Sequence, residues 1–141
     1  MTNIEVTGSA VPRFTRREIG AFVRKVMLAL ENLDRLGREI SEVSIAVVDD
    51  SAMSALNRKF RQKNKTTDVL TFAGEDQFLG DIVISIEQAR RQAADEKHSL
   101  ATEVRYLIVH GILHALGYDH ETDQGEMNSL ELEVRALVGL P

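Results

Sequence analysis

Residues 99–120 read SLATEVRYLIVHGILHALGYDH, and this stretch determines how the rest of the chain must pack. Its apolar residues recur on nearly every side of the helix that it predicts, which is typical of a helix buried at the centre of a domain. The helix is expected to begin at Ser99 and to stop at Gly117, because glycine readily adopts the positive φ that ends a helix. We therefore expect a central buried helix here.

Three of the chain's four histidines lie in this stretch. His110 and His114 are four residues apart, so both imidazoles project from one face of the helix. Gly117 allows the chain to turn, and His120 can then return to the same point. Burying two unpaired imidazoles would cost about 1–3 kcal/mol each, and a metal would remove that cost. The pattern predicts one Zn²⁺ per chain, with His110, His114 and His120 as ligands.

The same spacing occurs in the metzincin motif H-E-x-x-H-x-x-G-x-x-H. Here Gly111 occupies the position of the glutamate that serves as general base in those peptidases. Without this carboxylate, hydrolysis of a peptide bond lacks its usual proton acceptor. Either another group activates water, or the substrate brings its own nucleophile, as RNA does with its 2′-OH.

The remaining segments mix strands and helices without strict alternation, which indicates an α+β (mixed α/β) fold. We expect one zinc-hydrolase-like domain over residues 1–141, with a small mixed sheet of about four strands flanked by helices. Strands are expected at Ile4–Val6, Val43–Val48, Asp68–Phe72 and Leu79–Ser85. Further helices are expected at Phe14–Leu33, from Asp50 or Ser51 to Phe60, at Ile86–Lys97 and at Asp123–Val138. Thr15 and Glu18 have the spacing of a capping box.

The composition excludes several classes of function. The 17 basic and 22 acidic residues give a net charge of −5, so a basic coat for duplex DNA is excluded. The chain has no cysteine, which excludes disulfides and thiolate metal sites. No apolar run approaches the roughly 18 residues of a membrane span. Residues 1–14 do not resemble a signal peptide, and we expect a cytoplasmic protein.

Residues 58–65, R-K-F-R-Q-K-N-K, contain five basic residues and no acidic one. One interpretation is a solvated helix end, where cations are favoured. The other is a patch that contacts the phosphates of RNA, with Arg61, Lys63 and Lys65 as substrate-binding residues. Arg61 could hold a phosphate in bidentate fashion and stabilise charge in the transition state. Phe60 is expected in the core rather than as a platform for base stacking.

Three blocks of the chain resemble the YbeY family of bacterial rRNA maturation factors. Residues 110–120 fit its pattern H-G-x-L-H-L-x-G-Y-D-H at ten of eleven positions, with alanine in place of leucine at 115. Residues 57–72 resemble its N-x-x-[FY]-R-x-K-x-K-P-T-D-V-L-S-F stretch, and residues 79–85, LGDIVIS, resemble its L-G-D-I-x-I-S stretch. The glycine in place of glutamate belongs to the family pattern. Thr66 departs from the pattern, in which proline is usual at this position, and we expect the loop before the strand to be less rigid as a result.

This resemblance implies a single-domain fold with a small mixed sheet, and a zinc-dependent endoribonuclease specific for single strands. It implies a role in rRNA maturation, notably at the 3′ end of the small-subunit rRNA, and in ribosome quality control. The implied partners are single-stranded rRNA and the ribosome or small-subunit proteins, with no DNA and no membrane. The family's ligands correspond to His110, His114 and His120, and its arginine of catalytic or RNA-binding importance corresponds to Arg61.

Two other functions remain open at this stage. An assembly factor could dock on the ribosome and use zinc only to hold its fold, and the absence of a base in the motif favours this alternative. A metzincin-type peptidase is the other alternative, and Gly111 argues against it. Asp119 could orient a ligating histidine or simply form a turn after Gly117. Asp81, at the start of an expected strand, could line the cleft or only end the strand, and we favour the cleft.

Overall fold

The computed structural model describes residues 2–61, 67–119 and 121–141. In these residues the chain forms four strands, β1 (Asn3–Gly8), β2 (Glu42–Val48), β3 (Val69–Ala73) and β4 (Phe78–Ser85). The helices of the same residues are α1 (Arg16–Asn32), α2 (Asp50–Arg61), α3 (Ile86–Glu96), α4 (Leu100–Ala115) and α5 (Glu126–Leu137). Each expected strand and helix is confirmed, with ends that differ by a few residues.

The four strands form one mixed sheet in the order β1-β2-β4-β3. β1 pairs in parallel with β2, and β2 pairs in parallel with β4. β3 runs antiparallel to β4, because the short connection from Ala73 to Phe78 returns the chain directly beside itself. β3 is therefore an edge strand. The mixed four-stranded sheet confirms the α+β class.

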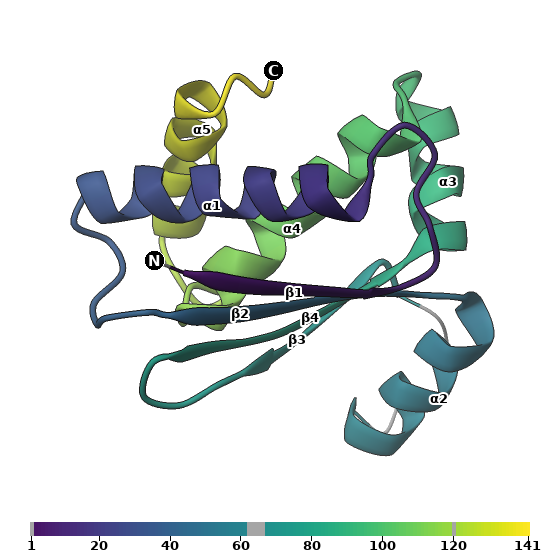
Figure 1. Ribbon diagram of the computed structural model, residues 1–141, viewed down its shortest axis with the longest axis horizontal. Coiled ribbons are helices and arrows are strands. Elements are labelled where there is room, and N and C mark those ends of the chain that lie inside the picture. The colour runs from purple at the N-terminus through teal and green to yellow at the C-terminus, as the bar shows by residue number, and fades with distance from the viewer. Residues whose placement is uncertain (1, 62–66, 120) are drawn as a thin grey trace.

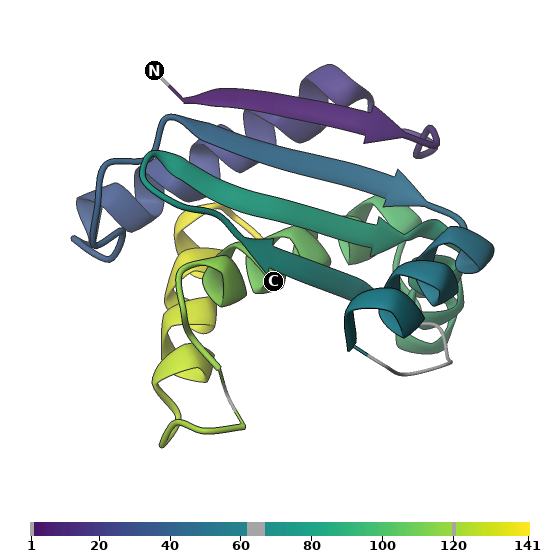
Figure 2. The same cartoon turned by 90° about the horizontal axis from the view of Figure 1, so that it is seen from below.

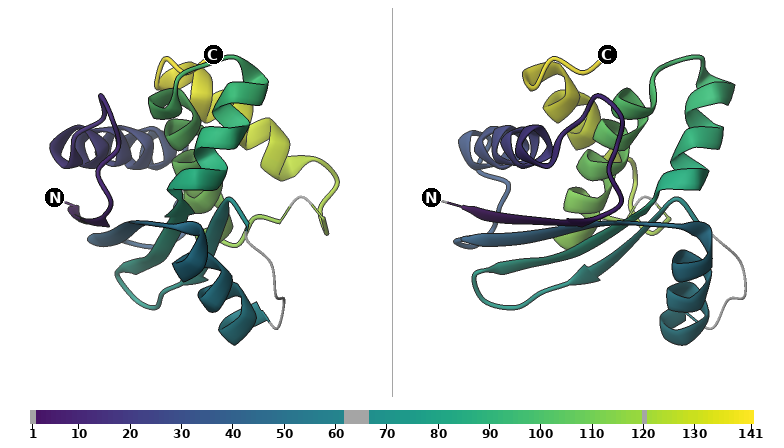
Figure 3. Two further views of the ribbon diagram at one scale, coloured as in Figure 1. Left: turned by 90° about the vertical axis from the view of Figure 1, so that its right-hand side faces the viewer. Right: turned by 45° about the vertical axis from the view of Figure 1, so that its right-hand side comes forward.

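The helices cover the two faces of the sheet unequally. α1, α3, α4 and α5 lie on one face, and α2 lies alone at one end of the other face (Figures 1 and 3). Seen from the side of α2, most of that second face has no helix over it (Figure 2). α4 crosses the sheet over β3 and β4. The helix that carries His110 and His114 therefore lies against the edge strand β3.

α4 is the central buried helix that its sequence predicts. Val104, Ile108, Ile112 and Leu113 are fully buried on it, and burial of each such side chain contributes about 1.5–3 kcal/mol. They belong to the main core, which lies between the sheet and the four helices on that face. A small second core of Met53, Leu70 and Val83 holds α2 against the opposite face.

Local signals define the ends of α1. The Thr15 hydroxyl accepts a hydrogen bond from the Glu18 N–H at 3.1 Å, and the Thr15 N–H donates to the Glu18 carboxylate at 3.0 Å. This reciprocal pair is the expected capping box. Phe14 lies before the helix and is buried in the core, so the expected helix start at Phe14 is two residues too early.

No helix in the described part of the chain is long and apolar enough to cross a membrane.

Candidate metal centre and substrate cleft

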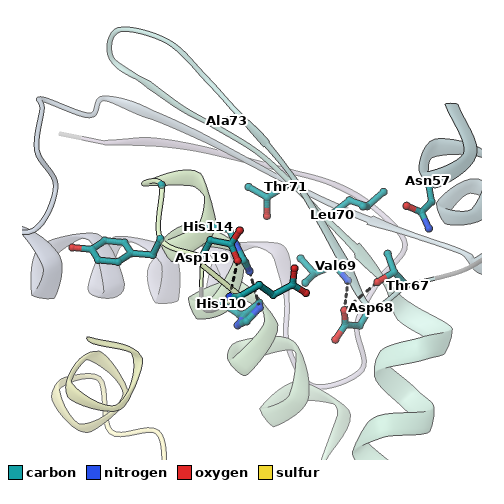
Figure 4. Close-up of a pocket in the computed structure, with 13 residues that line it drawn as sticks. Asn57, Thr67, Asp68, Val69, Leu70, Thr71, Ala73, His110, His114 and Asp119 are labelled. Carbon is teal, nitrogen blue, oxygen red and sulfur yellow. Dashed lines mark hydrogen bonds between the residues drawn. The ribbon is translucent and has the colours of Figure 1, made fainter. Parts of the chain in front are cut away.

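His110 and His114 lie together on the last turns of α4, as their spacing predicts. Their Nε2 atoms are 3.0 Å apart, and the two rings meet edge to face with centroids 4.5 Å apart. Figure 4 shows both imidazoles grouped beside Asp119. Both side chains are half-buried, so their donor atoms converge where a ligand from solvent can reach them.

The end of α4 directs the following chain back to this pair. The Gly117 N–H donates to the His114 carbonyl at 2.9 Å, and the Tyr118 N–H donates to the Leu113 carbonyl at 3.1 Å. These two bonds are those of a Schellman motif, and Gly117 adopts the left-handed backbone (φ 102°) that this motif needs. The expected glycine stop is confirmed. Asp119 then lies in the wall of the same cleft as the histidines.

The histidine pair opens on a cleft of about 580 Å³ along the edge of the sheet. One wall is β3 with the residues before it, another is the end of α4 with the turn after it, and Asn57 of α2 closes the far side. Figure 4 shows Thr71 and Asp68 on the β3 side and Asn57 beyond them. Because β3 is an edge strand, an extended ligand can lie along it without displacing another strand.

Glu131 of α5 is a carboxylate at the site that the sequence did not reveal. Its Oε1 lies 3.1 Å from Nδ1 of His110, and its Oε2 lies 3.9 Å from the Arg135 guanidinium. A carboxylate that accepts the Nδ1–H leaves Nε2 unprotonated and facing the cleft. From the sequence alone, no role at the site was expected for Glu131. Its position four residues before Arg135 on an amphipathic helix carries no local signal that it meets His110.

The donor set fits a zinc ion. Two ligands of a tetrahedral zinc ion, each about 2.0–2.1 Å from the metal, are about 3.3 Å apart. The 3.0 Å between the Nε2 atoms of His110 and His114 is close to that value, and Nδ1 of His110 is directed to Glu131 instead. Within residues 2–61, 67–119 and 121–141, no group of three His, Asp or Glu side chains could hold a metal. His120, the third expected ligand, lies outside the described residues.

Gly111 has a packing role that explains the missing glutamate. A Cβ built at this position would lie 2.6 Å from Cγ2 of Ile82, a buried residue of β4. Such a contact is far shorter than normal van der Waals distances. Position 111 therefore faces the sheet at close approach, whereas His110 and His114 face the cleft. A glutamate here would point into the core, and it would have no room.

The other expected site residues have mixed outcomes. Arg61 is the last residue of α2, but its side chain, Lys63 and Lys65 lie outside the part of the structure that is described. Asp119 accepts a hydrogen bond from the Glu121 N–H at 3.0 Å and also lines the cleft, so both of its expected roles are compatible with its place.

Two expectations about single residues are wrong. Asp81 is exposed on β4 beside Phe72 and is not among the residues that line the cleft. Phe60 is not a core residue: 54% of it is exposed. The apolar face of α2 is satisfied by Met53 and Leu56, which pack on the second core one and two turns earlier.

The fold and the site define an α+β protein of the His-x-x-x-His class, in which glycine replaces the glutamate of the metallopeptidases. A family model described as "Endoribonuclease YbeY" matches residues 5–139. The chain belongs to this family.

Individual relatives agree with the family model. A protein named Endoribonuclease YbeY from Solibacter usitatus is 43% identical over 110 residues, which cover 76% of this chain and 75% of the relative. One of the same name from Nautilia profundicola is 46% identical over 103 residues, with 71% and 74% covered. The solution structure of TM1509 from Thermotoga maritima is similar with a TM-score of 0.60 and 26% identity, covering 97% of this chain and 90% of that one.

Proposed function

We propose that this protein is a metal-dependent endoribonuclease specific for single strands, acting in rRNA maturation at the 3′ end of the small-subunit rRNA and in ribosome quality control. The observation that carries the proposal is the pair of histidine Nε2 atoms, 3.0 Å apart, at the wall of an open cleft along the β3 edge. Membership of the endoribonuclease family supports the choice of RNA as substrate. A cleft at a strand edge suits an extended, unpaired chain better than a duplex.

The proposed metal is one Zn²⁺, held by His110, His114 and His120. When bound, zinc supplies Lewis-acid stabilisation of charge on a phosphoryl oxygen. Glu131 would accept a hydrogen bond from the Nδ1–H of His110 and so hold its Nε2 in the unprotonated form that ligates a metal.

The proposed substrate contacts come from the basic run of residues 58–65. Arg61 would brace the scissile phosphate, and Lys63 and Lys65 would hold neighbouring phosphates. Arg58 and Lys59 are exposed on the last turn of α2, the same helix that supplies Asn57 to the cleft wall. This local concentration of cations reconciles RNA binding with a net charge of −5.

The experiment is cleavage of a single-stranded RNA by the wild type, by His114→Ala and by His98→Gln. His98 is the matched control, because it is a histidine bonded to Glu103 at 2.6 Å and does not line the cleft. We expect wild type and His98→Gln to cut, His114→Ala to be inactive, and a chelator to stop the wild type until zinc is restored.

Two outcomes would overturn the proposal. Equal cleavage by wild type and His114→Ala would indicate a contaminating nuclease. No cleavage by the zinc-loaded wild type would favour the assembly factor, in which the metal only supports the fold.

A further inference from the structure

Phe60 is an exposed aromatic residue in a cationic setting. It lies on the last turn of α2 with 54% of its surface open to solvent, and the preceding Arg58 and Lys59 are exposed as well. The ammonium of Lys59 lies 5.2 Å from the centre of the Phe60 ring. Exposing a phenyl ring is costly in water, since burying such a side chain contributes about 1.5–3 kcal/mol. Unlike the exposed Leu28, Leu132 and Leu137, Phe60 offers solvent a flat aromatic ring.

The ring is held in place by a second aromatic residue. Phe72 of β3 meets it edge to face, with centroids 5.2 Å apart and an angle of 72° between the rings. Phe72 is half-buried and packs on the second core with Leu56. An aromatic residue has few rotatable bonds, and this contact restricts them further. A ligand that stacks on Phe60 would lose little entropy from the protein side.

The aromatic pair does not line the cleft of the histidines, but several of its neighbours in the chain do. Asn57, one helical turn before Phe60, lines that cleft from α2. Thr71 and Ala73, the two neighbours of Phe72 in β3, line it from the sheet. Asn57, Thr71 and Ala73 are spread along the cleft in Figure 4, with the histidines between the sheet and α4. Phe72 itself faces the α2 side of the sheet, with Leu70 of the second core. Because Leu70 and Asn57 also line the cleft, the cleft continues around the β3 edge to that side, and we expect a chain that leaves the histidines around this edge to meet the Phe60 ring.

We propose that Phe60, held by Phe72, is a stacking platform for one base of the single-stranded RNA. The inference rests on the proposed function and adds to it a subsite for a nucleobase. Every base has a π-face, so stacking tolerates any sequence, and Lys59 can pair with the phosphate of the stacked nucleotide. A base in a duplex is already stacked on both sides and cannot lie on the ring. The platform thus gives a physical reason for preferring single strands.

The cations beside Phe60 favour RNA over an apolar protein surface as the ligand of this ring. A protein hot spot would bury Phe60 in a pocket and would also have to desolvate Arg58 and Lys59 beside it. A polyanion such as RNA instead gains binding free energy from both positive charges.

The test measures binding separately from cleavage. A fluorescent single-stranded oligonucleotide with 2′-O-methyl sugars keeps its bases but lacks the 2′-OH nucleophile. Its affinity for the zinc-loaded protein is measured by anisotropy for wild type, Phe60→Leu and Phe60→Tyr. Leu137→Ala is the control, because Leu137 is equally exposed (56%) but lies on α5. We expect Phe60→Leu to weaken binding about fivefold or more, as loss of one stacked base does, and the other two to bind like wild type.

A second measurement identifies the base. One nucleotide at a time is replaced by an abasic residue, and binding is measured with wild type and with Phe60→Leu. At one position, the abasic replacement should lower the binding affinity by the same factor as Phe60→Leu does. Combining that replacement with Phe60→Leu should lower the affinity no further than either change alone. Phe60→Leu should also leave the salt dependence of binding unchanged, since leucine removes no charge.

The proposal is overturned if Phe60→Leu binds like wild type, or if the two losses add at every position. This failure differs from failure of the proposed function. Cleavage that depends on His114 with no effect of Phe60→Leu would leave the nuclease and remove the platform. Loss of binding by Phe60→Leu in a protein that cuts nothing would leave the platform on an RNA-binding assembly factor.

Discussion

Gly111 of α4 packs directly against Ile82 of β4, so that a Cβ at residue 111 would lie 2.6 Å from the Ile82 Cγ2. The contact brings the helix that bears both histidines close to the sheet. It also means that the glycine at the position of the metallopeptidase glutamate is required in this chain by packing.

Gly111→Ala should therefore destabilise the protein. A buried overpacked methyl group costs about 1–3 kcal/mol, and this exceeds the roughly 1 kcal/mol that alanine gains over glycine in a helix. Gly20→Ala is the matched control, since Gly20 is also a buried helical glycine but its Cβ would find its nearest neighbour at 3.8 Å. Urea denaturation should show a lower free energy of unfolding for Gly111→Ala than for the wild type, and a higher one for Gly20→Ala. Equal gains would contradict the packing argument, and Gly111→Glu should fail to fold rather than acquire peptidase activity.

Zinc should stabilise the folded protein without being needed for folding. The main core contains apolar side chains from the strands and from α1, α3, α4 and α5, and it includes neither histidine. The chelated protein should therefore keep its helical circular dichroism. Zinc at 100 times its dissociation constant should raise the free energy of unfolding by about 2.7 kcal/mol. His110→Ala should abolish this increase, and His98→Gln should keep it. Unfolding on chelation would instead favour a structural metal.

Glu131→Gln should weaken zinc binding by about 10–100-fold, as loss of an outer carboxylate on a ligating histidine does. The neutral amide accepts the Nδ1–H of His110 less strongly than a carboxylate. Glu133→Gln removes the same charge from an exposed site on the same helix and should have little effect. Competition with a chromophoric chelator measures the zinc affinity of both variants. An equal change in the two variants would mean that Glu131 acts only through its charge at a distance.

Thr15→Ala should lower the free energy of unfolding by about 1 kcal/mol, because it removes the hydroxyl that caps α1. Thr15→Ser keeps the hydroxyl and should lose much less. Urea denaturation of the two variants tests this, and equal losses would mean that packing of the Thr15 methyl group matters more than the cap.

The capping box should also make stability depend on pH through Glu18. The hydrogen bond from the Thr15 backbone, followed by that with its side chain, lowers the pKa of the Glu18 carboxyl from its usual value. Because the folded pKa is below the unfolded one, this carboxylate stabilises the protein above the unfolded pKa. The contribution is lost as the pH falls through the folded pKa. The difference in unfolding free energy between wild type and Glu18→Gln should therefore shrink on acidification, and a growing difference would contradict the assignment.

The sequence by itself determined what depends on near neighbours in the chain. The helical spacing of His110 and His114, the stop at Gly117 and the capping box at Thr15 each arise from residues within a few positions of one another. Their geometry follows from the periodicity of a helix and from backbone hydrogen bonds at its ends. The apolar character of residues 100–116 likewise determined that this helix is buried.

Only the tertiary structure decided which distant elements meet at the site. The order β1-β2-β4-β3 places β3 at an edge, and the packing of α5 on α4 brings Glu131 to His110, 21 residues away in the chain. The tertiary structure also leaves Phe60 of α2 exposed and Asp81 of β4 outside the cleft wall. No local pattern encodes these contacts, because they arise from the competition of all apolar faces for one core. The distances between residues far apart in sequence are the outcome of that competition.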